Sequence, residues 1–110
     1  MNPKPAKYDI RISRGVTLEE YFKWKISGVA VVLHPGYTAE FTLSPNDGSA
    51  DVVVPCGIEQ DTLGEDFVHV LVTDEETLTY AWEQGQWWLN IEEPSGKVWR
   101  IVEGVVRVRD

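Results

Sequence analysis

The sequence has 110 residues, enough for one domain, and its 18 acidic and 10 basic residues give a net charge of −8. This balance argues against nucleic acid as a partner, because affinity for phosphate backbones comes mainly from Lys and Arg. Cys56 is the single cysteine, which excludes an internal disulfide. No apolar run is long enough to predict a membrane-spanning segment, so we expect no membrane partner.

The N-terminal segment, residues 1–7, contains two Pro and two Lys, and we expect either a flexible arm or an arm that docks on a neighbouring subunit. Residues 8–110 are expected to form a single domain. Apolar and polar residues alternate over Tyr8–Ile12 and Val16–Ile26, which predicts a short strand followed by a longer one. Glu20 falls on the apolar face of the second strand, so we expect it at a sheet edge or a bulge.

The middle of the chain predicts further strands separated by turns. Val29–Leu33 is either a short strand or part of a loop, whereas the alternation in Tyr37–Leu43 predicts a strand. Val52–Val54 is a short apolar run that we expect to stop at Pro55, since proline cannot donate to a ladder. The segment 56–66 has no clear period and is predicted to be a surface loop.

The last third of the chain predicts a strand, a short helix and a hairpin. Phe67–Val72 is the strand, and Thr73 followed by three acidic residues is typical of the start of a helix. We expect that helix over Thr77–Glu83, with Gly85 ending it. From Gly85 onward, alternating residues predict two long strands, joined by a turn at Glu93–Gly96.

The second strand of this hairpin changes parity. Its apolar face passes from Trp99 and Ile101 to Val106 and Val108, which predicts a β-bulge at Gly104, because one extra residue flips every later side chain. In total, about seven to eight short strands, with one short helix before the C-terminal hairpin, predict an all-β fold, an antiparallel β-sandwich. The aromatic side chains expected to fill its interior are Phe22, Trp24, Phe41, Trp87 and Trp99.

Motifs for catalysis, metal binding or a cofactor are missing from the sequence, so we expect a protein that is not an enzyme and has no cofactor. Zinc needs three or four ligands, usually Cys and His at close spacing, and here one Cys and two His lie far apart. We expect His34 in a loop, His69 on the surface of a strand and Cys56 as an inert thiol. Two acidic clusters predict a plain turn and a solvated loop: residues 46–51, and Glu59, Asp61, Glu65 and Asp66.

Exposed aromatic residues are the one positive signal for a binding surface. If Trp87 points inward, Trp88 points outward, and Tyr80 and Trp82 lie just upstream. Tyr and Trp are enriched at interface hot spots, so these three residues form a candidate contact surface. The alternative is that Trp88 is covered by the neighbouring helix or by the 56–66 loop.

Three stretches resemble a small β-sandwich domain of tailed bacteriophages and prophages, found at the N-terminus of baseplate upper proteins and in proteins of the long-tail-fibre type. These stretches are YDIRISRG (8–15), GYTAEFTLSPNDGS (36–49) and GQWWLNIEEPSGKVWRIVEGVVRVRD (85–110). The resemblance covers nearly the whole chain after residue 7, and its motifs are turns, a bulge and core aromatics. The chain departs from the pattern in its acidic 55–66 loop and its many tryptophans. Because the sequence ends at Asp110, we expect a free-standing accessory subunit and not one attached to a fibre or receptor-binding domain.

The resemblance implies a non-catalytic structural or accessory protein of a tailed-phage virion, located in the capsid, neck, tail or baseplate. Its partners would be other virion proteins or copies of itself. The N-terminus lacks the apolar stretch of a signal peptide, so we expect synthesis in the bacterial host cytoplasm. The alternative is a carbohydrate-binding or host-adhesion module in which exposed Trp faces stack on sugar rings, since sandwich folds host both roles.

Overall fold

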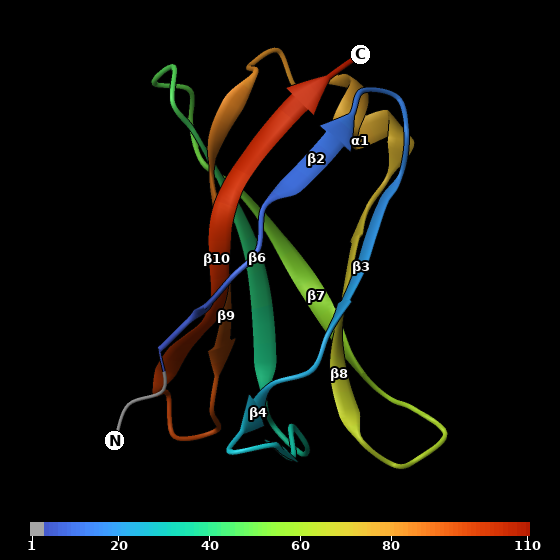
Figure 1. Cartoon of the computed structure of the whole chain (residues 1–110), viewed down its shortest axis with the longest axis vertical. Helices are drawn as coiled ribbons and strands as arrows, with labels where there is room; N and C mark the ends of the chain where they lie inside the picture. Colours follow the sequence, from blue (N-terminus) through green and yellow to red (C-terminus); the bar gives the residue numbers. More distant parts are fainter. Residues whose placement is uncertain (1–3) are drawn as a thin grey trace.

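The computed structural model describes residues 4–110, which are built mainly of strands (Figure 1). In chain order they are β1 (Ala6–Lys7), β2 (Ile10–Ser13), β3 (Leu18–Phe22), β4 (Lys25–Ile26), β5 (Val29–Ala30), β6 (Thr38–Pro45), β7 (Val52–Gln60), β8 (Asp66–Val72), the helix α1 (Asp74–Leu78), β9 (Gln84–Glu92) and β10 (Val98–Arg109). The prediction of an all-β fold with one short helix before a C-terminal hairpin is confirmed. Residues 1–3 of the expected arm lie outside the described residues, whereas Ala6–Lys7 form a strand.

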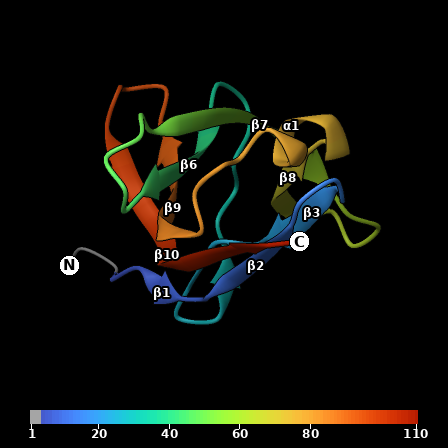
Figure 2. The same cartoon turned by 90° about the horizontal axis from the view of Figure 1, so that it is seen from above.

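One curled sheet holds most of these strands. Its hydrogen-bonded order is β1-β10-β9-β6-β7-β8-β3, with β2 also pairing with β10, while β4 and β5 form a separate hairpin. Both β1 and β2 run parallel to β10, so the sheet is mixed and not wholly antiparallel as expected. Figure 2 shows the strands curving around a common interior, so that β2 and β3 come to lie side by side. The described ladders pair β2 only with β10 and β3 only with β8, which leaves an open seam between these two strands.

Strand β7 connects the two halves of the curled sheet. The prediction that this strand stops at Pro55 and that residues 56–66 form a loop was wrong. Residues 52–56 pair with β6 and residues 57–60 pair with β8, so the strand continues through the expected loop. Pro55 lies opposite Glu40 of β6, where β8 has not yet joined the other side of the strand. A proline without a ladder partner on one side removes no hydrogen bond there, so it does not end the strand.

Strand β3 is shorter than predicted. The alternation over Val16–Ile26 is interrupted after Phe22, and the chain resumes as the short strand β4. Glu20 is half-buried on β3, which forms one end of the sheet, so its expected place at a sheet edge is confirmed. The helix is not at the expected Thr77–Glu83: it begins after Thr73, whose side chain accepts a hydrogen bond from the Glu76 N–H, and it ends at Leu78. Gly85, which was expected to end the helix, lies in β9.

The bulge in the C-terminal hairpin lies at Ile101 and not at the predicted Gly104. The register between β9 and β10 shifts between Arg100 and Val102, and Ile101 and Val102 are both buried. Gly104 has a different role: a Cβ atom there would lie 2.1 Å from the Tyr8 carbonyl oxygen. The glycine therefore lets the segment between β1 and β2 pack directly against β10.

Trp87 lies at the centre of the core and is fully buried. Its ring centroid is 5.4 Å from Phe41, 5.7 Å from Phe22 and 6.4 Å from Tyr8, and its Nε1 donates to the Tyr8 carbonyl at 2.8 Å. The aromatic residues predicted to point inward do so, with Trp24, Phe41 and Trp87 buried and Phe22 and Trp99 half-buried against them. Within the described part of the chain the only helix has five residues, far short of a membrane span.

Candidate functional site

Two of the three residues predicted to form a contact surface belong to the core. Tyr80 and Trp82 are 4% and 6% exposed and stack on each other with ring centroids 5.4 Å apart. The prediction of an exposed aromatic patch at these positions was wrong because α1 ends at Leu78, and residues 80–83 belong to neither a helix nor a strand. Side chains then alternate with a period of two, which turns Tyr80 and Trp82 inward and Ala81 outward.

Trp88 does lie on the outer face of the sheet, where it is half-buried. The group over its ring is neither α1 nor residues 56–66. It is Arg100, on the neighbouring strand β10, whose guanidinium carbon lies 4.4 Å from the centroid of the Trp88 ring. Arg100 is in turn 3.6 Å from a carboxylate oxygen of Glu103. A cation therefore occupies one face of the Trp88 ring, and a sugar would have to displace it to stack on that face.

A cluster of ionisable groups around His69 joins three strands. His69 of β8 makes 2.6 Å contacts with Glu19 of β3 through Nε2 and with Glu59 of β7 through Nδ1. The ring of Tyr21 stacks on His69 at 4.8 Å. The hydrogen bond to Glu19, supported by Glu59, raises the pKa of His69, and the same contact lowers the pKa of Glu19. Both ring nitrogens of His69 have a carboxylate partner, so the cluster holds β3, β7 and β8 together at the edge of the sheet. His69 lies on the surface of a strand, as predicted.

Asp66 was predicted to lie in a solvated loop, and this prediction was wrong. The side chain is buried at the start of β8, where it accepts hydrogen bonds from the Leu33 N–H at 2.6 Å and from His34 Nδ1 at 2.5 Å. Burial by itself raises the pKa of Asp66, but the Leu33 N–H and the His34 ring outweigh it and hold the pKa below its usual range. The Asp66 carboxylate therefore holds the loop that contains His34 in place, and the charge of Asp66 has a structural role.

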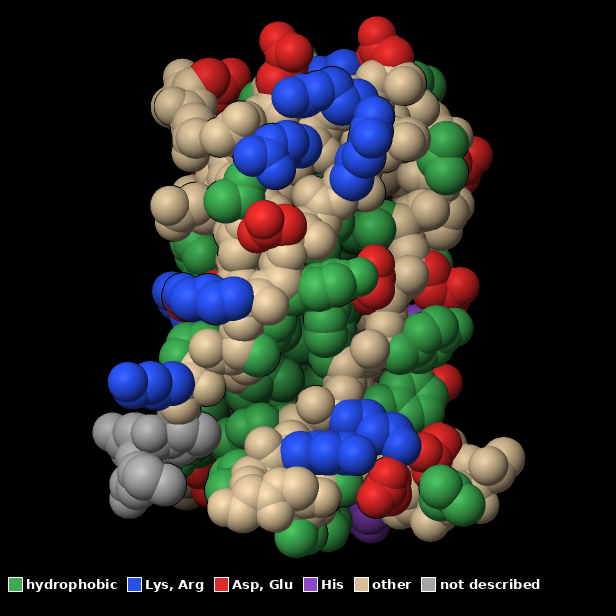
Figure 3. All heavy atoms as spheres, viewed as in Figure 1, with side chains coloured by type: hydrophobic (Ala, Val, Ile, Leu, Met, Phe, Trp, Pro, Cys, Tyr) green, Lys and Arg blue, Asp and Glu red, His purple; other side chains and the backbone are tan. Residues whose placement is uncertain are grey.

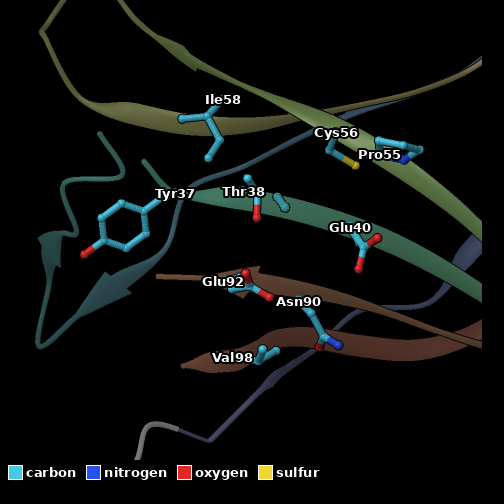
Figure 4. A pocket seen from close by; sticks show the side chains of 10 residues that line it. Tyr37, Thr38, Glu40, Pro55, Cys56, Ile58, Asn90, Glu92 and Val98 are labelled. Carbon is cyan, nitrogen blue, oxygen red and sulfur yellow. The ribbon is translucent and has the colours of Figure 1, made fainter. Parts of the chain in front are cut away.

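A broad hollow of about 610 Å³ lies over β6, β7 and β9 (Figure 4). Figure 4 shows Glu40, Asn90 and Glu92 around it, with the Cys56 sulfur at its border. Burial raises the pKa of the Cys56 thiol to about 11, which leaves it protonated and a poor nucleophile, as predicted. Among residues 4–110, no group of three or more His, Cys, Asp or Glu side chains is placed to hold a metal ion.

A second hollow, of about 440 Å³, combines an apolar floor with a basic rim, and we call it the lysine slot. It lies at the lower end of the open seam, between β1 and β10 on one side and the segment from β3 to β4 on the other. Figure 3 shows hydrophobic side chains exposed along a furrow on this side of the molecule, with Lys and Arg gathered beside and beyond it. Its lining residues are Lys4, Ala6, Lys7, Tyr8, Phe22, Lys23, Trp24, Lys25, Ile101 and Val102.

The four lysines of the slot are not equivalent. Lys7 pairs with Glu103, and Lys23 contacts Asp61 at 2.5 Å and Glu65 at 2.8 Å. Lys4 and Lys25 form no ion pair with any other described residue. The slot therefore holds unneutralised positive charge beside apolar surface, in a chain whose net charge is −8.

Sequence reasoning missed the lysine slot because its two walls lie far apart along the chain. Its walls come from residues 4–25 and from Ile101 and Val102, which the parallel pairing of β1 with β10 brings together. The one available signal was that four of the five lysines fall within the first 25 residues. A scan against protein-family models found no match to this chain, and a search of curated proteins also found none.

Proposed function

We propose that this protein is a non-catalytic docking module and that the lysine slot is the surface through which it binds an acidic protein partner. The observation that carries the proposal is an apolar, aromatic-floored hollow rimmed by four lysines on an otherwise acidic chain. Interfaces gain most of their affinity from a few desolvated anchors, often aromatic, surrounded by a polar rim. The slot has this arrangement on one side of an interface.

Each part of the slot has a separate role in the proposed complex. Tyr8, which is 46% exposed, and the half-buried Phe22 offer ring surface to an apolar side chain of the partner, and burying this surface supplies affinity. Lys4 and Lys25 offer charges without an ion pair in the described structure, and these steer an acidic partner and fix its register. The charge contribution predicts faster association at low salt than at high salt.

The partner we propose is a neighbouring subunit of a tailed-phage virion, in the capsid, neck, tail or baseplate. The resemblance of the 8–15, 36–49 and 85–110 stretches to phage β-sandwich domains supports this part of the proposal. A non-catalytic role is supported by the structural use of His69 and Asp66 and by the protonated thiol of Cys56. The carbohydrate-binding alternative is less favoured, because Arg100 covers one face of the Trp88 ring and both Tyr80 and Trp82 are buried.

The proposal is tested by incorporation of variants into virus particles. Lys25→Glu reverses one rim charge of the slot, Lys97→Glu makes the same change at the tip of the C-terminal hairpin, and Trp88→Ala tests the outer face of β9. Particles purified from cells that produce each variant are analysed by quantitative mass spectrometry, and circular dichroism confirms that each variant is folded.

We expect the wild-type chain, Lys97→Glu and Trp88→Ala in particles at similar levels and Lys25→Glu at a level reduced about tenfold or more. If Lys25→Glu is incorporated at the wild-type level, the slot is not the docking surface. If the wild-type chain is missing from purified particles, the virion assignment is wrong.

A further inference from the structure

A second group of basic residues lies at the far end of the same side of the molecule, and we call it the arginine cluster. It consists of Arg11 on β2 with Arg107 and Arg109 on β10, around a hollow of about 330 Å³ that Asp9 and Ile10 also line. Figure 3 shows this gathering of basic side chains over the upper parts of β2 and β10. Together the arginine cluster and the lysine slot contain seven of the ten basic residues of the chain.

The cluster carries like charges that the described part of the chain does not neutralise. Arg11 and Arg107 are direct partners in the parallel ladder, both are exposed, and like charges in such positions repel each other. None of the three arginines forms an ion pair within residues 4–110. Asp9 accepts a hydrogen bond from the Val105 N–H at 3.0 Å, and no ion pair joins it to the cluster.

One member of the cluster is already held in place. Arg109 Nη1 donates to the carbonyls of Glu83 at 2.9 Å and Val108 at 2.8 Å, which fixes the guanidinium and leaves its other donors available. Guanidinium groups bind carboxylates through paired hydrogen bonds, so a fixed Arg109 beside Arg11 and Arg107 is suited to a ligand with several carboxylates.

We propose that the arginine cluster is a second contact site that binds an acidic run in the same partner whose apolar side chain enters the lysine slot. This inference rests on the proposed docking function. Val102 of the slot and Arg107 of the cluster are five residues apart on β10, about 17 Å at the rise of a strand. An extended partner segment therefore needs an apolar anchor and a run of Asp or Glu separated by about five residues.

The inference is tested with a synthetic hexaglutamate peptide as the probe. The intact protein, labelled with ¹⁵N, is titrated with hexaglutamate, with hexaglutamine and with inorganic phosphate at matched ionic strength, and the arginine Nε signals are followed by NMR. Two variants remove two charges each, Arg11→Gln with Arg107→Gln in the cluster and Lys4→Gln with Lys25→Gln in the slot.

We expect hexaglutamate to shift the Nε signals of Arg11 and Arg107, and its affinity to fall about tenfold or more in the cluster variant but to change little in the slot variant. An equal loss in both variants would mean that the peptide responds only to net charge and would overturn the inference. Binding of phosphate but not of hexaglutamate would overturn it as well. Because the peptide has no apolar anchor, this titration reports on the cluster alone, whereas incorporation of Lys25→Glu reports on the docking function.

Discussion

Replacing Gly104 by Ala tests how the N-terminal segment is held against the C-terminal hairpin. The new Cβ would lie 2.1 Å from the Tyr8 carbonyl oxygen and 3.0 Å from Trp87 Nε1. Gly104 is not among the residues with positive φ, so the expected effect comes from this close approach and not from backbone strain. The Tyr8 segment must move by about 1 Å or more to make room, since carbon and oxygen atoms in contact normally lie more than 3 Å apart.

The expected cost follows from the hydrogen bonds that this movement breaks. They are the bond from Trp87 Nε1 to the Tyr8 carbonyl and the bond from the Tyr8 N–H to the Glu103 carbonyl. Two hydrogen bonds contribute about 1–3 kcal/mol, and overpacking a filled site costs about 1–3 kcal/mol more. We therefore expect Gly104→Ala to lower the free energy of unfolding by about 2–6 kcal/mol, a large part of the total for a small domain.

The assay is urea denaturation followed by tryptophan fluorescence, with Gly57→Ala as the matched control. Gly57 also lies in a strand, but a Cβ there would meet only the Glu59 carboxylate at 3.9 Å. The control is expected to be neutral or stabilising by up to about 1 kcal/mol. If Gly104→Ala and Gly57→Ala have the same free energy of unfolding, the close packing of the Tyr8 segment on β10 is refuted.

Three further predictions concern the ionisable groups. His69→Gln removes a ring whose raised pKa stabilises the fold, and this effect is fully present below the ordinary pKa of about 6.5. The effect is lost as the pH rises through the folded-state pKa, so the difference in urea midpoint between wild type and variant should shrink as the pH is raised from about 6. Asp66→Asn should lower the free energy of unfolding by about 1–3 kcal/mol at neutral pH. The lowered pKa of Asp66 stabilises the wild-type fold above about pH 3.9, and this stabilisation is lost as the pH falls through the folded-state pKa, so the variant should lose less stability than the wild type on acidification. Cys56 should react with iodoacetamide at pH 8 roughly a hundredfold more slowly than a free thiol, as measured by mass spectrometry, and a rate equal to that of glutathione would contradict the burial of this thiol.

The periodicity of the sequence was sufficient for most strands and for the aromatic core. The alternation in Tyr37–Leu43 and Phe67–Val72 corresponds closely to β6 and β8, because one face of each strand packs on the interior. The same reasoning failed for β7, since Pro55 by itself predicts the end of a strand. Whether a proline ends a strand depends on which neighbours the strand has at that residue, and this is a property of the tertiary structure.

The candidate site was less predictable than the fold. Gly104 was expected to mark a bulge, but its small size serves a contact with Tyr8, nearly a hundred residues earlier in the chain. The lysine slot likewise depends on parallel pairing between the two ends of the chain, which no local pattern specifies. The predicted patch failed for a local reason: the helix ends at Leu78 and not at Glu83, so Tyr80 and Trp82 lie beyond it and are buried.

Chemical footprinting of lysines tests docking through the lysine slot most directly. The free protein and purified particles are treated with acetic anhydride, and the acetylation of each lysine is measured by mass spectrometry. We predict that Lys4 and Lys25 become several-fold less reactive in particles, while Lys97 at the hairpin tip remains as reactive as in the free protein. Equal reactivity of Lys25 in the free protein and in particles that contain it would contradict docking through this surface.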